Sequence, residues 1–153
     1  MSFYIAYGSN LNKEQMRYRC PTAKVVGNGY IEDYELTFRL YATIEKAKGK
    51  KVPVTVWEID EVCESSLDRY EGYPRLYRKE IVPVNVSGKT YDAMVYIMNK
   101  DARPYHIPLE SYYKVVLQGY VDMKLEIEYL DKGILRTEEI IQGGFRRLLD
   151  QEK

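Results

Sequence analysis

A glutamate at the predicted end of a helix is the residue whose type and place could do acid–base chemistry. Asp60 is typical of a helix cap, and Gly72 followed by Pro74 ends the predicted helix, so Glu71 lies at its C-terminus. The helix dipole disfavours a carboxylate there, and the neighbouring tyrosines would take it partly out of water. Both effects raise a carboxyl pKa, which suits Glu71 to general acid–base catalysis near neutral pH.

A Gly-Ser-Asn loop follows the first predicted strand. The run 3–6 is apolar and aromatic and is typical of a buried strand that opens into a tight turn after Tyr7. Gly8 has no Cβ, so the backbone there can take a positive φ and a ligand can approach the main chain closely. The amides of Ser9 and Asn10 could then point together at an anionic group or a developing oxyanion.

Both motifs also have a purely structural interpretation. Glu71 could be a solvated glutamate paired with Arg69 or Arg75, and the loop could be a strand-to-helix turn without function. The single histidine, His106, stands in a proline-flanked loop and is interpreted as a loop residue. Ser9 therefore has no histidine near it in sequence, and we do not expect it to act as a nucleophile.

The elements that must position these residues form a mixed α and β pattern. Asn12 is predicted to cap a short helix, Ser87-Gly88-Lys89 marks a hairpin, and 46–51 is expected to be a solvated loop. Strands are predicted within 24–40, 52–59, 77–86 and 90–98, and helices over 109–118 and 137–149. We expect an α+β fold, with a small mixed β-barrel surrounded by helices in a single domain over 1–153.

Composition narrows the class of protein. The 153 residues suit one domain, and 23 lysines and arginines balance 23 aspartates and glutamates, which argues against a nucleic-acid binder or a polybasic membrane anchor. No apolar run approaches the roughly 20 residues of a membrane helix, and the strand-like pattern of the first residues leads us to expect no signal segment. Cys20 and Cys63 are far apart in sequence and are predicted to be two small buried thiols, which suits a reducing, cytoplasmic location.

Two further counts bear on the kind of site. With one histidine and two cysteines the sequence offers almost no basis for a zinc site, so no metal is expected. The chain has 16 tyrosines against 3 phenylalanines and 1 tryptophan, and tyrosine suits half-buried sheet surfaces, pocket walls and interfaces.

The order of the motifs along residues 3–130 resembles the γ-glutamylcyclotransferase-like family. The main segments that carry the resemblance are Tyr7-Gly8-Ser9-Asn10-Leu11 after the 3–6 run, Leu67-Asp68-Arg69-Tyr70-Glu71-Gly72-Tyr73-Pro74, and Tyr77-Arg78. Supporting marks are Cys20-Pro21, Ala42-Thr43-Ile44, Val52-Pro53, Trp57-Glu58-Ile59 and the spacing from Tyr112 to Gly119. Leu40-Tyr41 departs from the family's small residues and is expected to narrow the pocket.

The resemblance implies a small mixed α/β barrel and release of a γ-glutamyl group as 5-oxoproline without metal or organic cofactor. For that chemistry Glu71 is expected to take a proton from the substrate's α-ammonium and pass it to the leaving amine. Backbone amides of the Gly8-Ser9-Asn10 loop would hold the oxyanion. The tyrosines chosen for the pocket walls and for contacts to the substrate carboxylate are Tyr7, Tyr77 and Tyr112.

The sequence therefore favours an enzyme, a γ-glutamyl cyclotransferase of lyase or acyltransferase type acting on a small γ-glutamyl amino acid or amine. The alternatives are a non-catalytic module that binds a γ-glutamyl-like metabolite and a tyrosine-rich interaction domain. The C-terminal helix within 136–153 has no assigned role. It could dock on the body, on a partner, or on a second copy of the chain in a homodimer.

Overall fold

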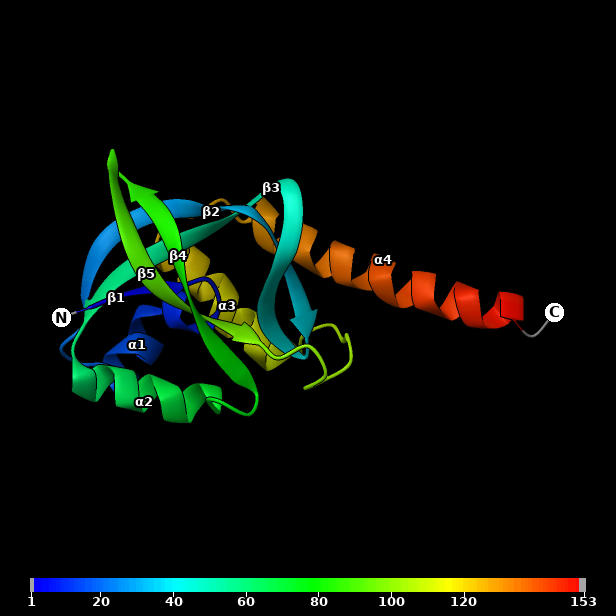
Figure 1. Ribbon diagram of the computed structural model, residues 1–153, viewed down its shortest axis with the longest axis horizontal. Coiled ribbons are helices and arrows are strands. Elements are labelled where there is room, and N and C mark those ends of the chain that lie inside the picture. Colours follow the sequence, from blue (N-terminus) through cyan, green and yellow to red (C-terminus); the bar gives the residue numbers. More distant parts are fainter. Residues whose placement is uncertain (1, 152–153) are drawn as a thin grey trace.

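The computed structural model describes residues 2–151, which fold around one five-stranded sheet (Figure 1). The strands are β1 (Ser2–Ala6), β2 (Lys24–Arg39), β3 (Tyr41–Ile59), β4 (Tyr77–Val86) and β5 (Lys89–Met98). The helices are the short 3₁₀ turn η1 (Ser9–Leu11), α1 (Lys13–Arg19), α2 (Glu61–Glu71), α3 (Glu110–Asp122) and α4 (Glu128–Gln151). The predicted α+β class is confirmed.

The first strand occupies the centre of the sheet. The strand order is β2-β3-β1-β5-β4, with β1 antiparallel to β3 and parallel to β5. Tyr4, Ile5 and Ala6 are buried, as expected for a strand with neighbours on both sides. The loop that follows β1 is therefore delivered to the middle of one end of the sheet.

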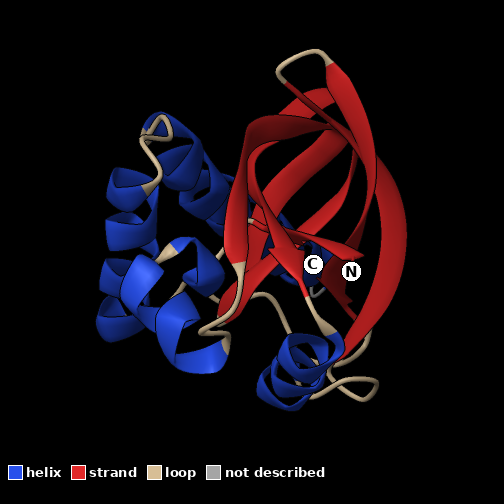
Figure 2. Ribbon diagram, turned by 90° about the vertical axis from the view of Figure 1, so that its left-hand side faces the viewer, coloured by secondary structure: helices blue, strands red, loops and turns tan. Residues whose placement is uncertain are grey.

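The sheet curls strongly, as Figure 2 shows, but it is not a closed barrel. Within residues 2–151, no hydrogen-bonded ladder joins the two edge strands β2 and β4. The buried side chains of Val84 and Val86 stand against β2 at Gly29 and Gly27, so side chains rather than main-chain hydrogen bonds fill the seam. The prediction of a closed barrel is wrong in this detail.

The local signals at the helix ends behave as the sequence predicts. The side chain of Asn12 accepts a hydrogen bond from the Gln15 amide at the start of α1, and Asp60 accepts one from the Cys63 amide at the start of α2. Gly72 takes the left-handed conformation (φ 64°) that ends α2. These three residues set the start of α1, the helix after the Gly-Ser-Asn loop, and both ends of α2, the helix that bears Glu71.

The segment 46–51 is not the predicted loop. It belongs to β3, and its end residues Lys46 and Lys51 lie opposite Tyr34 and Glu32 of β2; the register shifts between these two pairs, so that residues 47–50 form an irregular bulge beside Asp33. The glycine that suggested a loop, Gly49, takes a positive φ (82°) within the strand, and its amide donates to the Asp33 side chain. Composition alone misled here because the partner strand, which pairs with Lys46 and Lys51 at the two ends of the segment, is not visible in the segment's own sequence.

Cys20 and Cys63 form a disulfide, with their Cα atoms 4.9 Å apart. Cys20 follows α1 and Cys63 lies in the first turn of α2, so two helices distant in sequence bring the sulfurs together. The prediction of two separate thiols is wrong. The cysteines therefore give no support for a reducing compartment, and a cytoplasmic location stays a prediction.

The last helix, α4, is longer than the predicted 137–149 and only its first half lies on the body (Figure 1). There Gly133 packs against Leu36 of β2, and the buried hydroxyl of Thr137 donates to the Gly133 carbonyl. The same hydroxyl accepts a hydrogen bond from the Phe38 amide of β2, 2.9 Å away. No helix in the described range has both the length and the apolar character to cross a membrane.

Replacing Thr137 by valine is expected to lower the free energy of unfolding by about 1–3 kcal/mol, because the buried amide of Phe38 then loses its acceptor. Urea titrations of the two proteins measure the difference. Thr137→Ser keeps the hydroxyl and serves as the matched control. A valine variant as stable as the serine variant would show that this hydrogen bond does not hold α4 to the sheet.

Candidate active site

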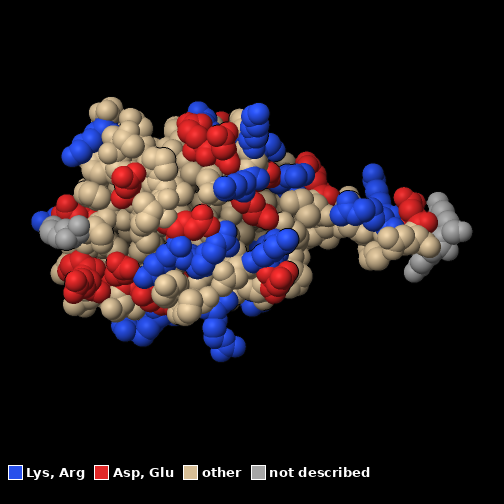
Figure 3. All heavy atoms as spheres, viewed as in Figure 1, with Lys and Arg blue, Asp and Glu red and all other residues tan. Residues whose placement is uncertain are grey.

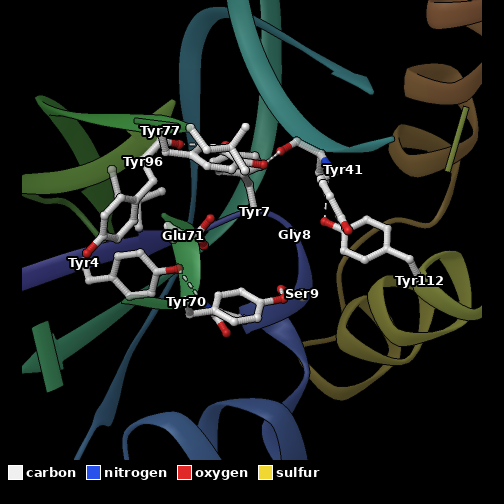
Figure 4. A pocket seen from close by; sticks show the side chains of 14 residues that line it. Tyr4, Tyr7, Gly8, Ser9, Tyr41, Tyr70, Glu71, Tyr77, Tyr96 and Tyr112 are labelled. Atoms are coloured by element: carbon white, nitrogen blue, oxygen red, sulfur yellow. Dashed lines mark hydrogen bonds between the residues drawn. The ribbon is translucent and has the colours of Figure 1, made fainter. Parts of the chain in front are cut away.

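A cavity of about 240 Å³ opens where the end of β1, the end of α2, the β2–β3 turn and α3 meet (Figure 4). All seven residues that the sequence singles out lie in its lining. Its walls are formed by Tyr4, Ile5, Tyr7, Gly8, Ser9, Asn10, Tyr41, Ala42, Tyr70, Glu71, Leu76, Tyr77, Tyr96 and Tyr112. The structure thus joins the loop after β1 to the end of α2, two segments about sixty residues apart in the chain.

Gly8 is required by close packing and not by a positive φ. Its φ is −125°, so the expected positive value is not adopted. A Cβ on this residue would lie 3.3 Å from the Cβ of Ala42 and 3.4 Å from the hydroxyl oxygen of Tyr112, both tight contacts. A side chain here would push the β2–β3 turn and α3 away from the loop.

The amides at the start of η1 are free to bind an anion. The carbonyls of Gly8 and Ser9 accept hydrogen bonds from Leu11 and Asn12, which closes the 3₁₀ turn. The first N–H groups of such a turn have no acceptor within it, and those of Ser9 and Asn10 make no hydrogen bond to any described residue. Two donors are therefore available beside the cavity.

Glu71 is the last residue of α2, and its half-buried carboxyl group points into the cavity (Figure 4). Burial raises its pKa from 4.5 to about 7, while the positive charge of Arg19 acts to lower it. The ion pairs of residues 2–151 do not include Glu71, so pairing with Arg69 or Arg75 is not what the structure shows. Near neutral pH this carboxyl group can both accept and return a proton.

Arg19 is the cation whose charge acts on the carboxyl group of Glu71, although Arg19 does not line the cavity. Its guanidinium group lies over the ring of Tyr70, 3.4 Å from the ring centre. It donates to the side-chain oxygens of Asn10 at 2.7 Å and Gln15 at 2.6 Å. Arg19 therefore ties α1, the loop after β1 and the end of α2 together behind the cavity.

The three predicted tyrosines use their hydroxyl groups in different ways. Tyr7 donates to the carbonyl of Tyr96 at 2.6 Å and Tyr77 donates to the carbonyl of Ala42 at 2.7 Å, so both protons are committed to the backbone. Tyr112 instead accepts from the Ala42 amide at 3.1 Å and keeps its own proton available. Burial raises the pKa of the Tyr112 hydroxyl well above its ordinary value, so it remains a donor.

The cavity is also lined by four tyrosines that the sequence analysis did not select as site residues: Tyr4, Tyr41, Tyr70 and Tyr96. Tyr41 packs edge-on against Tyr112, with ring centres 5.3 Å apart, at the place where Leu40-Tyr41 was expected to narrow the pocket. The sequence signal for Tyr70 was its position directly before Glu71. Tyr4 and Tyr96 gave no local signal, because their side chains meet through the pairing of β1 with β5.

A polar network behind the cavity holds α2 in place. The hydroxyl of Tyr96 donates to Asp68 at 2.6 Å, and Lys79 of β4 forms ion pairs with Asp68 and Glu64. These contacts fix the last two turns of α2 against the sheet and so position Glu71. His106 lies outside the cavity lining, in a loop bridged to Arg39.

No group of three His, Cys, Asp or Glu side chains within residues 2–151 is arranged to hold a metal ion. The charged group that lines the cavity is the carboxyl of Glu71, surrounded by tyrosine rings and main-chain amides.

The fold and this cavity place the protein among small α+β proteins with a single carboxyl group in a tyrosine-lined pocket. A sequence profile described as "Gamma-glutamyl cyclotransferase, AIG2-like" matches residues 4–114. The chain belongs to this family.

Curated relatives and solved structures agree with that assignment. The gamma-glutamylcyclotransferase of Mus musculus is 31% identical over 146 residues, covering 84% of this chain and 75% of the relative. The human protein of the same name is 30% identical over 146 residues with the same coverage. A solved structure named "Gamma-glutamyl cyclotransferase" superimposes with a TM-score of 0.75 at 28% identity, covering 86% of this chain and 85% of the other.

Glu71→Gln is expected to change stability in a pH-dependent way. Below pH 4.5 the carboxyl group is protonated in both the folded and the unfolded chain. The difference in free energy of unfolding between the two proteins therefore does not change with pH in this range. Between 4.5 and about 7 the unfolded chain releases a proton that the folded protein keeps, so the wild type loses stability relative to the glutamine variant. The relative loss reaches about 3 kcal/mol above pH 7.

Urea unfolding of both proteins across this pH range measures the effect. Glu61→Gln removes an exposed carboxylate from the other end of the same helix and is the matched control, which does not reproduce the loss. A difference between wild type and Glu71→Gln that stays constant with pH would contradict a raised pKa.

Proposed function

We propose that this protein is a γ-glutamyl cyclotransferase that converts a γ-glutamyl substrate into 5-oxoproline and a free amine. The observation that carries the proposal is the half-buried Glu71, with a pKa of about 7, facing a cavity next to two unbonded main-chain amides. Membership of the family and relatives named gamma-glutamylcyclotransferase support the same conclusion.

The reaction needs one residue that moves a proton twice. The carboxylate of Glu71 takes a proton from the substrate's α-ammonium group, and the freed nitrogen attacks the γ-carbonyl carbon. The new C–N bond closes the five-membered ring. Glu71 then gives that proton to the departing nitrogen as the original amide bond breaks. The carboxylate takes the second proton from the ring nitrogen, which becomes the neutral lactam N–H, and passes it to the released amine, which leaves as an ammonium ion; the enzyme therefore ends in its starting protonation state. No metal or organic cofactor enters these steps.

The main-chain amides of Ser9 and Asn10 are suited to donate hydrogen bonds to the oxyanion that forms on the γ-carbonyl oxygen. They are preorganised by the η1 turn and have no competing acceptor among residues 2–151. Such donors act most strongly where water is excluded, and removal of one from an oxyanion hole typically costs about 100-fold to 1000-fold in rate.

The size of the cavity favours a small acyl group. A volume of about 240 Å³ accommodates a folded glutamyl arm, with the leaving group directed to the mouth beside Tyr41. The free proton of the Tyr112 hydroxyl is suited to bind the substrate's α-carboxylate. Holding the arm folded brings nitrogen and carbonyl together, and this proximity supplies much of the acceleration in an intramolecular reaction.

Glu71→Gln is expected to lower kcat/KM for 5-oxoproline release by about 100-fold or more, because glutamine cannot accept the α-ammonium proton. The assay measures 5-oxoproline from a panel that includes γ-glutamyl-alanine and γ-glutamyl-ε-lysine, which also identifies the leaving amine. Glu61→Gln is the control for loss of a carboxylate on α2 and retains activity. Full activity of Glu71→Gln would exclude this mechanism.

The rate is expected to follow the protonation of Glu71. Because the reaction needs the carboxylate, kcat/KM rises with pH up to about 7 and becomes level above it, until ionisations of the substrate intervene. A rate profile over this range, collected with one substrate of the panel, measures the midpoint. A midpoint near 4.5, the value for a carboxyl in water, would contradict the role of burial.

A module that binds a γ-glutamyl-like metabolite without turning it over is the second candidate. The same cavity could hold the ligand, and the free donor of Tyr112 serves binding as well as catalysis. Thermal stabilisation by the panel compounds without formation of 5-oxoproline would select this function.

A further inference from the structure

Arg19, the last residue of α1, is half-buried behind the candidate active site and does not belong to its lining. The dipole of α1 favours a cation at this end of the helix. The next residue, Cys20, is joined by the disulfide to Cys63 of α2. The place of Arg19 is therefore set by its own helix and by a covalent link to the helix that bears Glu71.

The first contact of Arg19 fixes the side chain of Asn10. The guanidinium group donates to the side-chain oxygen of Asn10 at 2.7 Å, and the side-chain nitrogen of Asn10 donates to the Tyr4 hydroxyl at 2.9 Å. Asn10 is only 2% exposed, so water does not compete for either bond. The side chain of Asn10 cannot turn while both bonds persist, and this holds the main chain of the loop at this residue.

The second contact joins Arg19 to Ser9 through Tyr70. The guanidinium group lies 3.4 Å from the centre of the Tyr70 ring, and the hydroxyl oxygens of Tyr70 and Ser9 are 2.8 Å apart (Figure 4). Tyr70 directly precedes Glu71 on α2. The two residues whose main-chain amides are available beside the cavity, Ser9 and Asn10, are thus both tied by their side chains to one guanidinium group. The helix end that bears Glu71 is tied to the same group.

Arg19 also brings a positive charge to a carboxyl group that is surrounded by phenols. The side chains around Glu71 include Tyr4 and Tyr7 of β1, Tyr77 of β4, Tyr96 of β5 and Tyr112 of α3. Burial raises the pKa of each of these five hydroxyl groups above its ordinary value, so all five are neutral near pH 7. Tyr41 of β3 and Tyr70 of α2 complete the wall, and Asp68 of α2 is paired with Lys79 of β4.

Charges at the surface add little to this local effect. Lys and Arg side chains are interspersed with Asp and Glu side chains over the face of the molecule that Figure 3 shows. The whole chain is balanced as well, with 23 basic and 23 acidic residues, and solvent screens exposed charges. A change of Arg19 alone is therefore a clean test of its effect on Glu71.

We propose that Arg19 is a positioning residue for the cyclotransferase reaction, acting through its two contacts and its charge without touching the substrate. The contacts hold the amides of Ser9 and Asn10 at a fixed place relative to Glu71. The charge favours the carboxylate, which is the form that accepts the α-ammonium proton. This inference rests on the proposed function, because it concerns how the donors and the proton acceptor of that reaction are held together.

Arg19→Lys separates the contacts from the charge. Lysine keeps the positive charge, but its ammonium group cannot stack on Tyr70 as a planar guanidinium does while it also bonds Asn10 and Gln15. We expect kcat to fall about threefold to tenfold with little change in KM, because the loop donors act mainly in the transition state. The midpoint of the pH–rate profile is expected to stay at the wild-type value.

Arg19→Met removes the contacts and the charge together. We expect the same loss of kcat and, in addition, a midpoint that rises from about 7 by about 0.5–1 pH unit. This rise is smaller than for a direct ion pair, because no ion pair joins Arg19 to Glu71 among residues 2–151. Arg17→Met removes an exposed arginine of the same helix and is the matched control, which changes neither kcat nor the midpoint.

Two measurements give these quantities. Release of 5-oxoproline as a function of pH yields kcat, KM and the midpoint for each variant. A carbon-13 NMR titration of the Glu71 carboxyl group, assigned with the Glu71→Gln protein, yields its pKa without turnover. A merely structural role of Arg19 would lower the free energy of unfolding and move neither the midpoint nor the NMR titration.

Wild-type kcat and a wild-type midpoint in folded Arg19→Met would overturn the inference and leave the proposed function standing. Equal losses of kcat in Arg19→Lys and Arg19→Met, with no movement of the midpoint or of the NMR titration in either, would overturn the role of the charge. The activity of the wild type distinguishes these failures from failure of the proposed function, in which no substrate of the panel yields 5-oxoproline and the inference falls with it.

Discussion

The burial of one carboxyl group at the end of α2 is the constraint around which the rest of the site is organised. A carboxylate in a tyrosine-lined cavity loses hydration, and burial therefore brings the pKa of Glu71 to about 7. This state persists only if the helix end cannot shift toward water. Gly72 ends the helix sharply, and the contacts of Asp68 with Tyr96 and Lys79 hold its last turns on the sheet.

The tyrosines of the cavity both hold the fold together and determine which hydrogen-bond donors a ligand meets. Tyr7 and Tyr77 give their protons to backbone carbonyls of other strands, which makes the cavity wall a rigid part of the fold. Their rings then supply the apolar surface that desolvates Glu71. Tyr112 differs because the Ala42 amide donates to it, so its proton is left for a ligand. The direction of one hydrogen bond therefore separates Tyr112, which we propose binds the substrate, from the two wall residues.

Much of the site was predictable, because its key parts are local signals. Asp60, Gly72 and Asn12 determine helix ends from their own side chains and conformations, and so the position of Glu71 at a helix end follows from a few neighbouring residues. The errors came from partners that are distant in sequence. The disulfide of Cys20 with Cys63, the strand character of 46–51 and the open seam at Val84 each depend on an element far along the chain.

The sequence by itself determined the α+β class, the caps at several helix ends, the Gly-Ser-Asn loop after a buried strand and the candidate acid–base residue. Only the tertiary structure decided that the loop and Glu71 share one cavity, that burial raises the pKa of Glu71 to about 7, and that Gly8 serves close packing instead of a positive φ. The reason is physical. Capping and turns act over a few residues, whereas desolvation and steric contact depend on everything that folding brings within a few ångströms.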